Sequence, residues 1–428
     1  MPILQPESLA FEKTFYNESD IGTNAYQLTD NPGEDSIFYQ NPSFFSPDGS
    51  KFLFRQELGD GIYRLHILDL KSGENILLRN DPSFGWMPSW SGNGSEVYVG
   101  HEGKIIAIDP DTLNEREIEL QTDSWITFLN VREKRILFVE EERGRGNTVH
   151  ERLSIVNEDG TGYRRLYEID KKTEFYLDHP LFIDDDKVLF LTRGVDRDFL
   201  GDFNRPYILD IGKGTLKRMP RECSHYDIHP KGDKILCASE GYVINLEGKI
   251  LKETGIQGHG VWAPDGDAFL MTGDPIPVPE GDQYFGKIVL MSLGSDEIIP
   301  VISHENTYDS SLGVHIQPNA QFSRDGLQII YESDRRQKKN SDLFLVELGD
   351  RSREEKGEEK EVQKAEDGAN AGRELAGKKI AMSKWVDAAF EQVECPISER
   401  RIKKGSYQGP LIDAHIHIAP IPDDPNYE

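Results

Sequence analysis

The chain has 428 residues, of which 37% are hydrophobic and 29% are charged, and its formal net charge is −27 at pH 7. This length allows one large domain with an extension, or two domains. The acidic balance argues against a protein that binds nucleic acid, because such a protein presents a basic surface. No segment approaches the length of apolar sequence that spans a bilayer, so we expect no membrane partner.

The N-terminal extension, residues 1–24, has neither a basic region nor a sustained apolar run, so we expect no secretory signal peptide there. The three cysteines, Cys223, Cys237 and Cys395, show no CxxC spacing. They predict neither a disulfide framework nor a zinc site. Together these features predict a cytoplasmic protein in a reducing compartment.

An internal repeat begins near residue 42. An apolar strand followed by a turn of Pro/Asn-Asp-Gly character recurs in seven units, which start near residues 42, 87, 126, 179, 225, 259 and 317. Their mean spacing of about 46 residues fits four short strands per unit. Each unit continues with a hairpin such as RLHILDLKSGENILL, in which apolar residues alternate around a Gly-containing turn.

The seventh unit has three evident strands, the last at 343–348. The stretch AYQLTD, residues 25–30, is the candidate for its fourth strand, because closing the ring removes a long exposed sheet edge. We therefore predict an all-β protein, a seven-bladed β-propeller over residues 25–348 that an N-terminal strand closes, with a charged C-terminal extension.

The composition changes after Leu348. Residues 349–378 are almost all charged or small, and we expect either a solvated helix or a disordered linker. Residues 379–428 contain GPLIDAHIHIAPIP, which resembles the first strand of an amidohydrolase barrel with Asp413, His415 and His417 in its metal-binding motif. Such a barrel needs about 250 residues, so the segment is either the start of a truncated domain or a vestige.

Polar side chains recur at one level of the predicted channel. The first strand of each blade lines a propeller's channel, and we compare the residues four positions before each turn: Pro42, Met87, Ile126, His179, His225, His259 and Asn319. Four consecutive blades thus present an imidazole or an amide. Alternation along the strand adds Gln317 and then His315 to the face of Asn319. We expect these groups at the channel mouth, although each could instead be satisfied within its own blade.

Basic loops are expected at the same mouth, because the loops between second and third strands reach it. Their cationic residues are Arg193, Arg197, Arg205, Arg335, Arg336, Lys338 and Lys339. Arginine binds carboxylates through two parallel hydrogen bonds, so this collar suits an anionic ligand. Solvated surface is the alternative interpretation.

The chain resembles the oligogalacturonate lyase family, seven-bladed propellers that cleave short pectin fragments by β-elimination. The resemblance covers about residues 25–348 and rests on the blade pattern and on NRPYILD, SHYDIHPKGDK, GHGVWAPDGD and HIQPNAQFSRDG. It implies that His225 is the Brønsted base, that Arg205 assists at the substrate, and that His259 binds a manganese ion. His179 is a candidate second acid/base or substrate contact, and Arg193, Arg197, Arg335 and Arg336 are candidate substrate contacts.

The last blade departs from the family's Gln-x-x-His-Pro-His arrangement. Gln317 and Asn319 stand in the two histidine places around Pro318, and His315 lies beside Val314, where the glutamine would be. Imidazole suits Mn²⁺ better than a neutral amide does. The candidate ligands His259, His315, Gln317 and Asn319 are therefore compatible with Mn²⁺, with Ca²⁺ and added oxygen ligands, or with no metal.

The resemblance implies a lyase that acts on a small anionic oligosaccharide built from uronates. The alternative is a non-catalytic TolB-like propeller that binds a ligand or protein, including one that serves an amidohydrolase-like partner. The two hypotheses differ in whether His225, His259, Gln317 and Asn319 converge on one point.

Overall fold

The computed structural model describes residues 15–18, 23–31, 33–39, 41–58, 63–80, 87–143, 148–170, 175–194, 204–273, 286–309, 314–337 and 340–348. All of them belong to one compact unit, Met1–Arg351, and the second unit, Ser352–Glu428, contains none. Several predictions fall outside these residues: Arg197, Lys338, Lys339, the linker and the Asp413–His417 motif. The predicted domain boundaries stay predictions. In the described ranges there is no helix of the length and apolarity that a membrane crossing requires.

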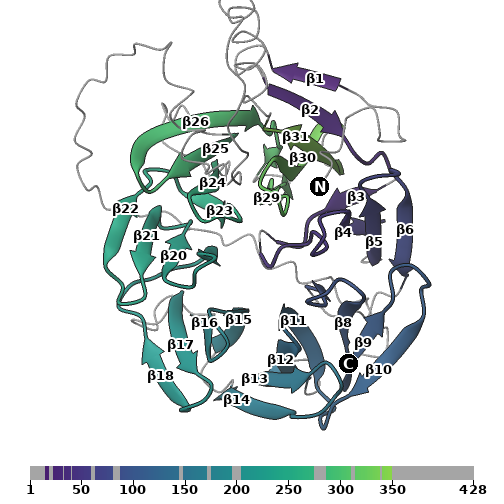
Figure 1. Ribbon diagram of the computed structural model, residues 1–428, viewed down its shortest axis with the longest axis vertical. Coiled ribbons are helices and arrows are strands. Elements are labelled where there is room, and N and C mark those ends of the chain that lie inside the picture. The colour runs from purple at the N-terminus through teal and green to yellow at the C-terminus, as the bar shows by residue number, and fades with distance from the viewer. Residues whose placement is uncertain are drawn as a thin grey trace, which may run out of the picture. The chain divides into compact units, whose positions relative to one another are not determined.

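Seven antiparallel sheets form a ring around a central channel, as predicted (Figure 1). Six of these blades have four strands each, which run from the channel outwards in chain order. Blade one contains β3 (Glu34–Ser36), β4 (Lys51–Glu57), β5 (Tyr63–Asp69) and β6 (Asn75–Arg79), and blade two contains β7 (Ser89–Trp90), β8 (Val97–His101), β9 (Lys104–Ile108) and β10 (Glu115–Glu119). Blade three contains β11 (Trp125–Arg132), β12 (Arg135–Arg143), β13 (Thr148–Asn157) and β14 (Arg164–Asp170).

The next three blades repeat this order. Blade four contains β15 (Phe175–Phe182), β16 (Lys187–Gly194), β17 (Arg205–Asp210) and β18 (Thr215–Arg218), and blade five contains β19 (Tyr226–Ile228), β20 (Lys234–Cys237), β21 (Tyr242–Asn245) and β22 (Ile250–Glu253). Blade six contains β23 (Gly258–Trp262), β24 (Ala268–Gly273), β25 (Lys287–Ser292) and β26 (Ser295–Ser303). A short hairpin of β27 (Tyr308–Asp309) and β28 (Val314–His315) leads to blade seven.

Blade seven joins the two ends of the propeller. It contains β29 (Gln321–Phe322), β30 (Gln328–Gln337) and β31 (Asn340–Glu347), and its next strand is β2 (Thr23–Gln27) from the N-terminal side. Strands β2 and β31 pair with Ala25 opposite Val346, which confirms the predicted closing strand. The sequence analysis missed β1 (Phe15–Glu18), which adds a fifth strand outside β2.

The turns between first and second strands explain the repeated Asp-Gly signature. In blade one the Gly49 N–H donates to the Ser46 carbonyl over 2.8 Å, and Asp48 accepts a 2.6 Å hydrogen bond from the Ser46 hydroxyl. Gly49 has φ +76°, a conformation that glycine adopts without steric cost. Blade seven repeats this turn with Ser323, Asp325 and Gly326 at φ +73°.

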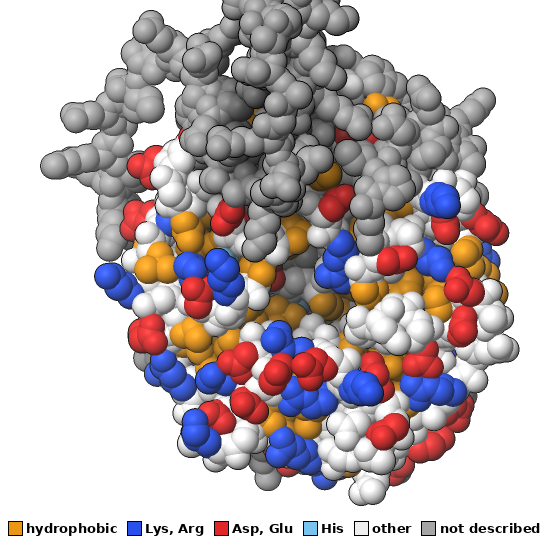
Figure 2. All heavy atoms as spheres, in the orientation of Figure 1, with side chains coloured by type: hydrophobic (Ala, Val, Ile, Leu, Met, Phe, Trp, Pro, Cys, Tyr) orange, Lys and Arg blue, Asp and Glu red, His pale blue; other side chains and the backbone are white. Residues whose placement is uncertain are grey.

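Burial follows the radial position of each strand. The inner and middle strands are apolar runs such as β24, in which every residue is buried between neighbouring blades. The outer strands are polar, and all four residues of β18 are exposed. Charged outer strands discourage edge-to-edge pairing with other chains. Figure 2 accordingly shows charged side chains over the outer ring and hydrophobic side chains around the central hollow.

Candidate active site

An unusual backbone conformation marks one level of the channel. Non-glycine residues take a positive φ there in five blades: Met87 (64°), Phe128 (53°), His179 (47°), His225 (46°) and Asn319 (39°). Such values are uncommon outside glycine. The register of the first strand shifts at two of these residues, between Thr127 and Asn130 in β11 and between Asp178 and Leu181 in β15. Bulges of this kind redirect side chains, so the repeated conformation gives these residues a common orientation.

This level matches the one expected from the sequence except in blade three. The residue at this level of blade three is Phe128, two positions after Ile126, which the comparison of the seven repeats had indicated. In blade six the level is held by His259, which follows Gly258 at φ 151°. Gly260 on the other side has no room for a side chain, because an added Cβ would lie 2.8 Å from Met271 Sδ.

Three histidines from blades four, five and six meet around Tyr39. The ring of Tyr39 lies 4.1 Å from that of His179, 5.9 Å from His225 and 5.6 Å from His259 between centroids. The rings of His225 and His259 stack at 4.2 Å with an interplanar angle of 15°. His259 is fully buried and His179 nearly so, whereas His225 keeps partial exposure. His225 is therefore the imidazole of this cluster that a ligand can reach most readily.

Tyr39 belongs to a segment of blade one that crosses the channel. We call residues 37–39 and 41–44 the crossing segment, and Figure 1 shows the chain after β3 entering the middle of the ring. The Asn41 amide donates to the Tyr226 carbonyl in blade five, and the Phe44 N–H donates to Gln321 Oε1 in blade seven over 2.8 Å. The Trp90 indole N–H of blade two donates to the Phe44 carbonyl over 2.8 Å. Three blades thus hold the segment in place.

Asp227 is an inward carboxyl group that the sequence analysis did not single out. Its Oδ2 accepts the Trp262 N–H over 2.8 Å and its Oδ1 accepts the Ile228 N–H over 2.9 Å. Burial raises the pKa of Asp227 to about 7, although these hydrogen bonds oppose the shift. The residue is half-buried. Its carboxyl group thus links β19 to blade six and changes its protonation near neutral pH.

A repeat signal could have identified Asp227. Two positions before the turn, Asn130 in blade three and Gln321 in blade seven accept a backbone N–H of the next blade, over 2.9 and 2.8 Å. Asp227 occupies this position in blade five with a carboxyl group in place of the amide. In a comparison of the repeats, a carboxyl group at a position that carries an amide in other blades would therefore have marked Asp227 as a candidate functional residue.

The predicted cationic residues have contacts of their own. Arg205 Nη1 donates to the Pro220 carbonyl over 2.5 Å, on the segment that leads to His225. Arg335 donates to the Ser303 carbonyl, and its guanidinium lies 5.4 Å from the Phe344 ring centroid. Arg336 pairs with Asp30 and, over 3.2 Å, with Asp342 at the ring closure. The backbone of Arg193 lies in β16, paired with Tyr176. Their predicted contacts with substrate stay predictions.

Comparison with known proteins finds solved structures of similar fold, but it finds no protein that matches the chain by sequence. No protein-family model and no curated protein matches the chain. An oligogalacturonate lyase in complex with manganese aligns with a TM-score of 0.63 and 17% identity, covering 79% of this chain and 96% of that one. An oligogalacturonate lyase from Vibrio parahaemolyticus aligns with a TM-score of 0.63 and 15% identity, covering 80% and 98%. A chain of a mitotic checkpoint complex aligns with a TM-score of 0.50 and 12% identity, covering 75% of this chain and 91% of that one. What these proteins share is the fold.

The predicted metal ligands stay predictions, because two of them are the amides Gln317 and Asn319 and the side chain of a third, His315, lies outside the described residues. In the ranges that the structure describes, no group of three or more His, Cys, Asp or Glu residues could hold a metal ion. Asn319 donates to Glu332 Oε1 over 3.2 Å. His315 pairs through its backbone with Tyr308, and its side chain is outside the described part. Gln317 is partly buried.

A disulfide bond joins Cys223 to Cys237, and the expectation of unpaired cysteines was wrong for this pair. Both residues are fully buried, with Cα atoms 4.8 Å apart. Cys223 lies just before β19 and Cys237 ends β20, so the bond spans the hairpin that carries His225. Neither cysteine lies in a CxxC motif, and only the pairing of β19 with β20 brings them together.

Proposed function

We propose that this propeller is a lyase that cleaves small uronate-containing oligosaccharides by β-elimination. The observation that carries the proposal is the histidine cluster around Tyr39, in which His225 retains access to the channel. The fold that the chain shares with two oligogalacturonate lyases supports the proposal without deciding the chemistry.

The reaction needs a base for the C5 proton of a uronate and an acid for the leaving oxygen at C4. His225 in its neutral form accepts the proton. Asp227 lies two residues further along the chain, and its pKa of about 7 leaves it partly protonated at neutral pH, so it is suited to donate to the leaving oxygen. Arg205 is the proposed partner of the uronate carboxylate, where a guanidinium stabilises the charge that develops during proton removal.

No step of this proposal passes through a metal. A manganese ion bound by His259, His315, Gln317 and Asn319 stays a prediction, and chelation tests it. The cytoplasmic location that we expect from the sequence stays a prediction. The Cys223–Cys237 disulfide argues against that location, since disulfides persist mainly in oxidising compartments.

The test follows the ultraviolet absorbance of the new C4–C5 double bond during incubation with oligogalacturonates, with and without EDTA and added Mn²⁺. His225→Ala should lower the rate by about 10²- to 10⁴-fold, the usual contribution of a general base. The matched control is His150→Ala, which removes a partly exposed imidazole of blade three that contacts Glu168 at 3.7 Å. An unchanged rate in His225→Ala would refute the assignment of the base.

A non-catalytic binding module is the second candidate function. The observation in its favour is the crossing segment, which packs Tyr39 against His179 and His259 and leaves both histidines buried. Absence of double-bond formation by the wild-type protein across galacturonate, glucuronate and mannuronate oligomers would favour this candidate.

A further inference from the structure

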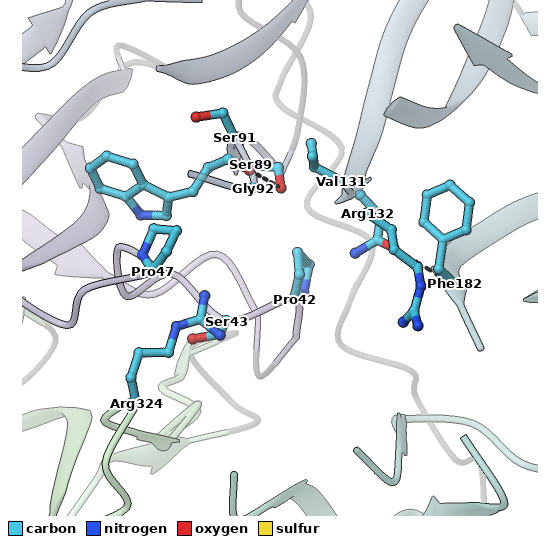
Figure 3. A pocket seen from close by; sticks show the side chains of 12 residues that line it. Pro42, Ser43, Pro47, Ser89, Ser91, Gly92, Val131, Arg132, Phe182 and Arg324 are labelled. Atoms are coloured by element: carbon cyan, nitrogen blue, oxygen red, sulfur yellow. Dashed lines mark hydrogen bonds between the residues drawn. The ribbon is translucent and has the colours of Figure 1, made fainter. Parts of the chain in front are cut away.

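A cavity lies against the crossing segment, with Pro42 and Ser43 in its wall. It has a volume of about 410 Å³ and is shared by blades one, two, three, four and seven. Its lining consists of Pro42, Ser43, Pro47, Ser89, Trp90, Ser91, Gly92, Asn130, Val131, Arg132, Phe182 and Arg324. Figure 3 shows Arg324 on one side of the cavity, Arg132 and Phe182 on the other, and Pro42 between them. Ligand pockets commonly measure about 300–1,000 Å³, so the volume suits a small molecule.

This cavity opens at the mouth opposite the predicted substrate loops. Pro47, Gly92 and Arg324 belong to the turns between first and second strands. The histidine level lies four residues earlier in each first strand, and none of Tyr39, His179, His225 and His259 lines the cavity. Pro42 and Ser43 are the parts of the lining that belong to the crossing segment. The cavity and the histidine cluster are therefore separate sites.

Arg324 brings an uncompensated positive charge to this cavity. Its Nη2 donates to the Phe45 carbonyl over 3.0 Å, and its Nε contacts the Ser46 carbonyl at 3.4 Å. Among the described residues no carboxylate lies within ion-pair distance of it. Arg324 is an exposed residue, and the protein around its guanidinium lowers its pKa by displacing part of its water.

The nearby charged groups are already occupied. Arg132 Nε lies 2.7 Å from Asp185 Oδ1. Asp48 accepts hydrogen bonds from Ser46 and Ser50 within its own turn. Asp325 accepts from the Ser323 hydroxyl over 2.6 Å. Arg324 thus lines this cavity without a carboxylate partner among the described residues.

Ser43 supplies a second unsatisfied group. Its hydroxyl oxygen is buried and has no hydrogen-bond partner in the described part of the chain. The hydroxyl of Ser91, by contrast, donates to Asn93 Oδ1 over 3.0 Å and accepts the Glu96 N–H over 3.0 Å. A buried polar group without a partner costs free energy. The cavity is thus lined by a hydroxyl without a partner and by a guanidinium whose hydrogen bonds go to neutral carbonyls, which leaves its charge unbalanced.

The remaining walls are apolar. Pro42, Pro47 and Phe182 line the cavity, together with Trp90, whose indole is held by its hydrogen bond to the Phe44 carbonyl. Such surfaces accept the C–H faces of a ring, while the polar groups orient it. One uncompensated guanidinium balances one negative charge. A phosphate carries about −1.5 to −2 at neutral pH, and its excess charge would be repelled by an acidic protein.

We propose that this cavity binds a small polyhydroxylated carboxylate of about monosaccharide size. The carboxylate lies on Arg324, where guanidinium and carboxylate form charge-assisted hydrogen bonds. A ligand hydroxyl pairs with Ser43, and the ring packs between Trp90 and the prolines. The inference rests on the cavity and does not require the lyase activity.

Isothermal titration calorimetry with D-galacturonate tests the proposal, with D-galactose and inorganic phosphate as comparison ligands. D-Galacturonate should bind the wild-type protein and should still bind the His225→Ala variant, because no residue of the histidine cluster lines the cavity. Arg324→Gln should weaken binding at least about tenfold, since it removes a charged hydrogen-bond partner. The control Arg221→Gln removes another guanidinium that donates to a backbone carbonyl, that of Gly248 over 3.1 Å, and should leave binding unchanged.

Four results would overturn the proposal: no binding by the wild-type protein, equal binding by Arg324→Gln, equal affinity for D-galactose, or equal affinity for phosphate. Loss of binding in His225→Ala would place the ligand at the histidine cluster and would also overturn it. If Arg324→Gln does not fold, Ser43→Ala provides the test. That variant removes a hydroxyl with no partner in the protein, so the fold should tolerate it while binding weakens severalfold. Unchanged binding by Ser43→Ala would then count against the site.

Discussion

At the scale of single residues, the left-handed backbone of the channel level gives a way to separate folding from function. His225 has φ 46°, a region in which a residue with a Cβ is strained by about 1–2 kcal/mol. Glycine adopts this conformation freely. The same left-handed conformation recurs at this level in five blades. Strained conformations of this kind persist where the surrounding structure fixes them.

His225→Gly should therefore be more stable than His225→Ala, by roughly 1 kcal/mol, because it relieves the strain although it loses the same imidazole. Both variants should lack the proposed lyase activity. Urea denaturation of the two variants measures the difference. A His225→Gly protein that is clearly less stable than His225→Ala would show that the strained conformation is absent in solution.

At the scale of elements, a disulfide bond stabilises the hairpin of β19 and β20. Strand β19 has three residues and β20 has four, so their ladder contributes few hydrogen bonds. The disulfide between Cys223 and Cys237 closes a loop with a sequence separation of 14. A loop of this size loses enough chain entropy in the unfolded state to stabilise the fold by about 3 kcal/mol.

Cys237→Ser should lower the free energy of unfolding by roughly 3 kcal/mol, and dithiothreitol should destabilise the wild-type protein to a similar extent. Thiol titration in denaturant checks the bond directly. The chain has three cysteines, so two more thiols should react after reduction than before it. Equal thiol counts before and after reduction would contradict the disulfide.

At the scale of the whole molecule, the ring closes over buried acids. Gln27 donates to Asp342 over 3.2 Å and Ser341 donates to the Asp35 carbonyl over 2.9 Å, so polar side chains join the N-terminal strands to blade seven. Burial raises the pKa of Asp35 to about 6 and that of Asp342 to about 7, and it raises the pKa of Glu332 well above its usual range. All three shifts have burial as their largest cause.

The stability of the propeller should consequently fall as the pH rises. A carboxyl group whose pKa is higher in the folded state holds its proton more tightly there, so folding is penalised once the unfolded carboxyl ionises above about pH 4, and the penalty grows until the folded group also ionises near pH 7. Urea denaturation at pH 5 and pH 8 should show the lower stability at pH 8.

Asp227→Asn isolates one part of this pH dependence. The pKa of Asp227 is also about 7, and the equivalent positions of other blades carry amides that make the same contact. In the wild-type protein, the free energy of unfolding should be lower at pH 8 than at pH 5. In the Asp227→Asn variant this decrease should be smaller by on the order of 2 kcal/mol. A wild-type stability that is constant or rises over this range would contradict the raised pKa values.

The ring and its closure could be predicted from the sequence because each depends on short-range patterns. A turn such as Ser46–Gly49 is held by its own Asp48 and by a glycine at positive φ, so the same few residues recur wherever the turn does. Alternating apolar residues mark the strands in the same local way. The missing fourth strand of blade seven then predicted the role of the N-terminal strand, which pairs as expected.

The sites depended on contacts that no local pattern contains. Asn41 and Tyr226 are 185 residues apart, and their hydrogen bond helps to place Tyr39 among the histidines. Arg324 and Phe45 are 279 residues apart, and their contact sets the charge beside Ser43. The sequence by itself determined the blades, since the strand and turn patterns that define them lie within each repeat. The tertiary structure alone decided what fills the channel, because closure of the ring brings residues from distant blades to its centre.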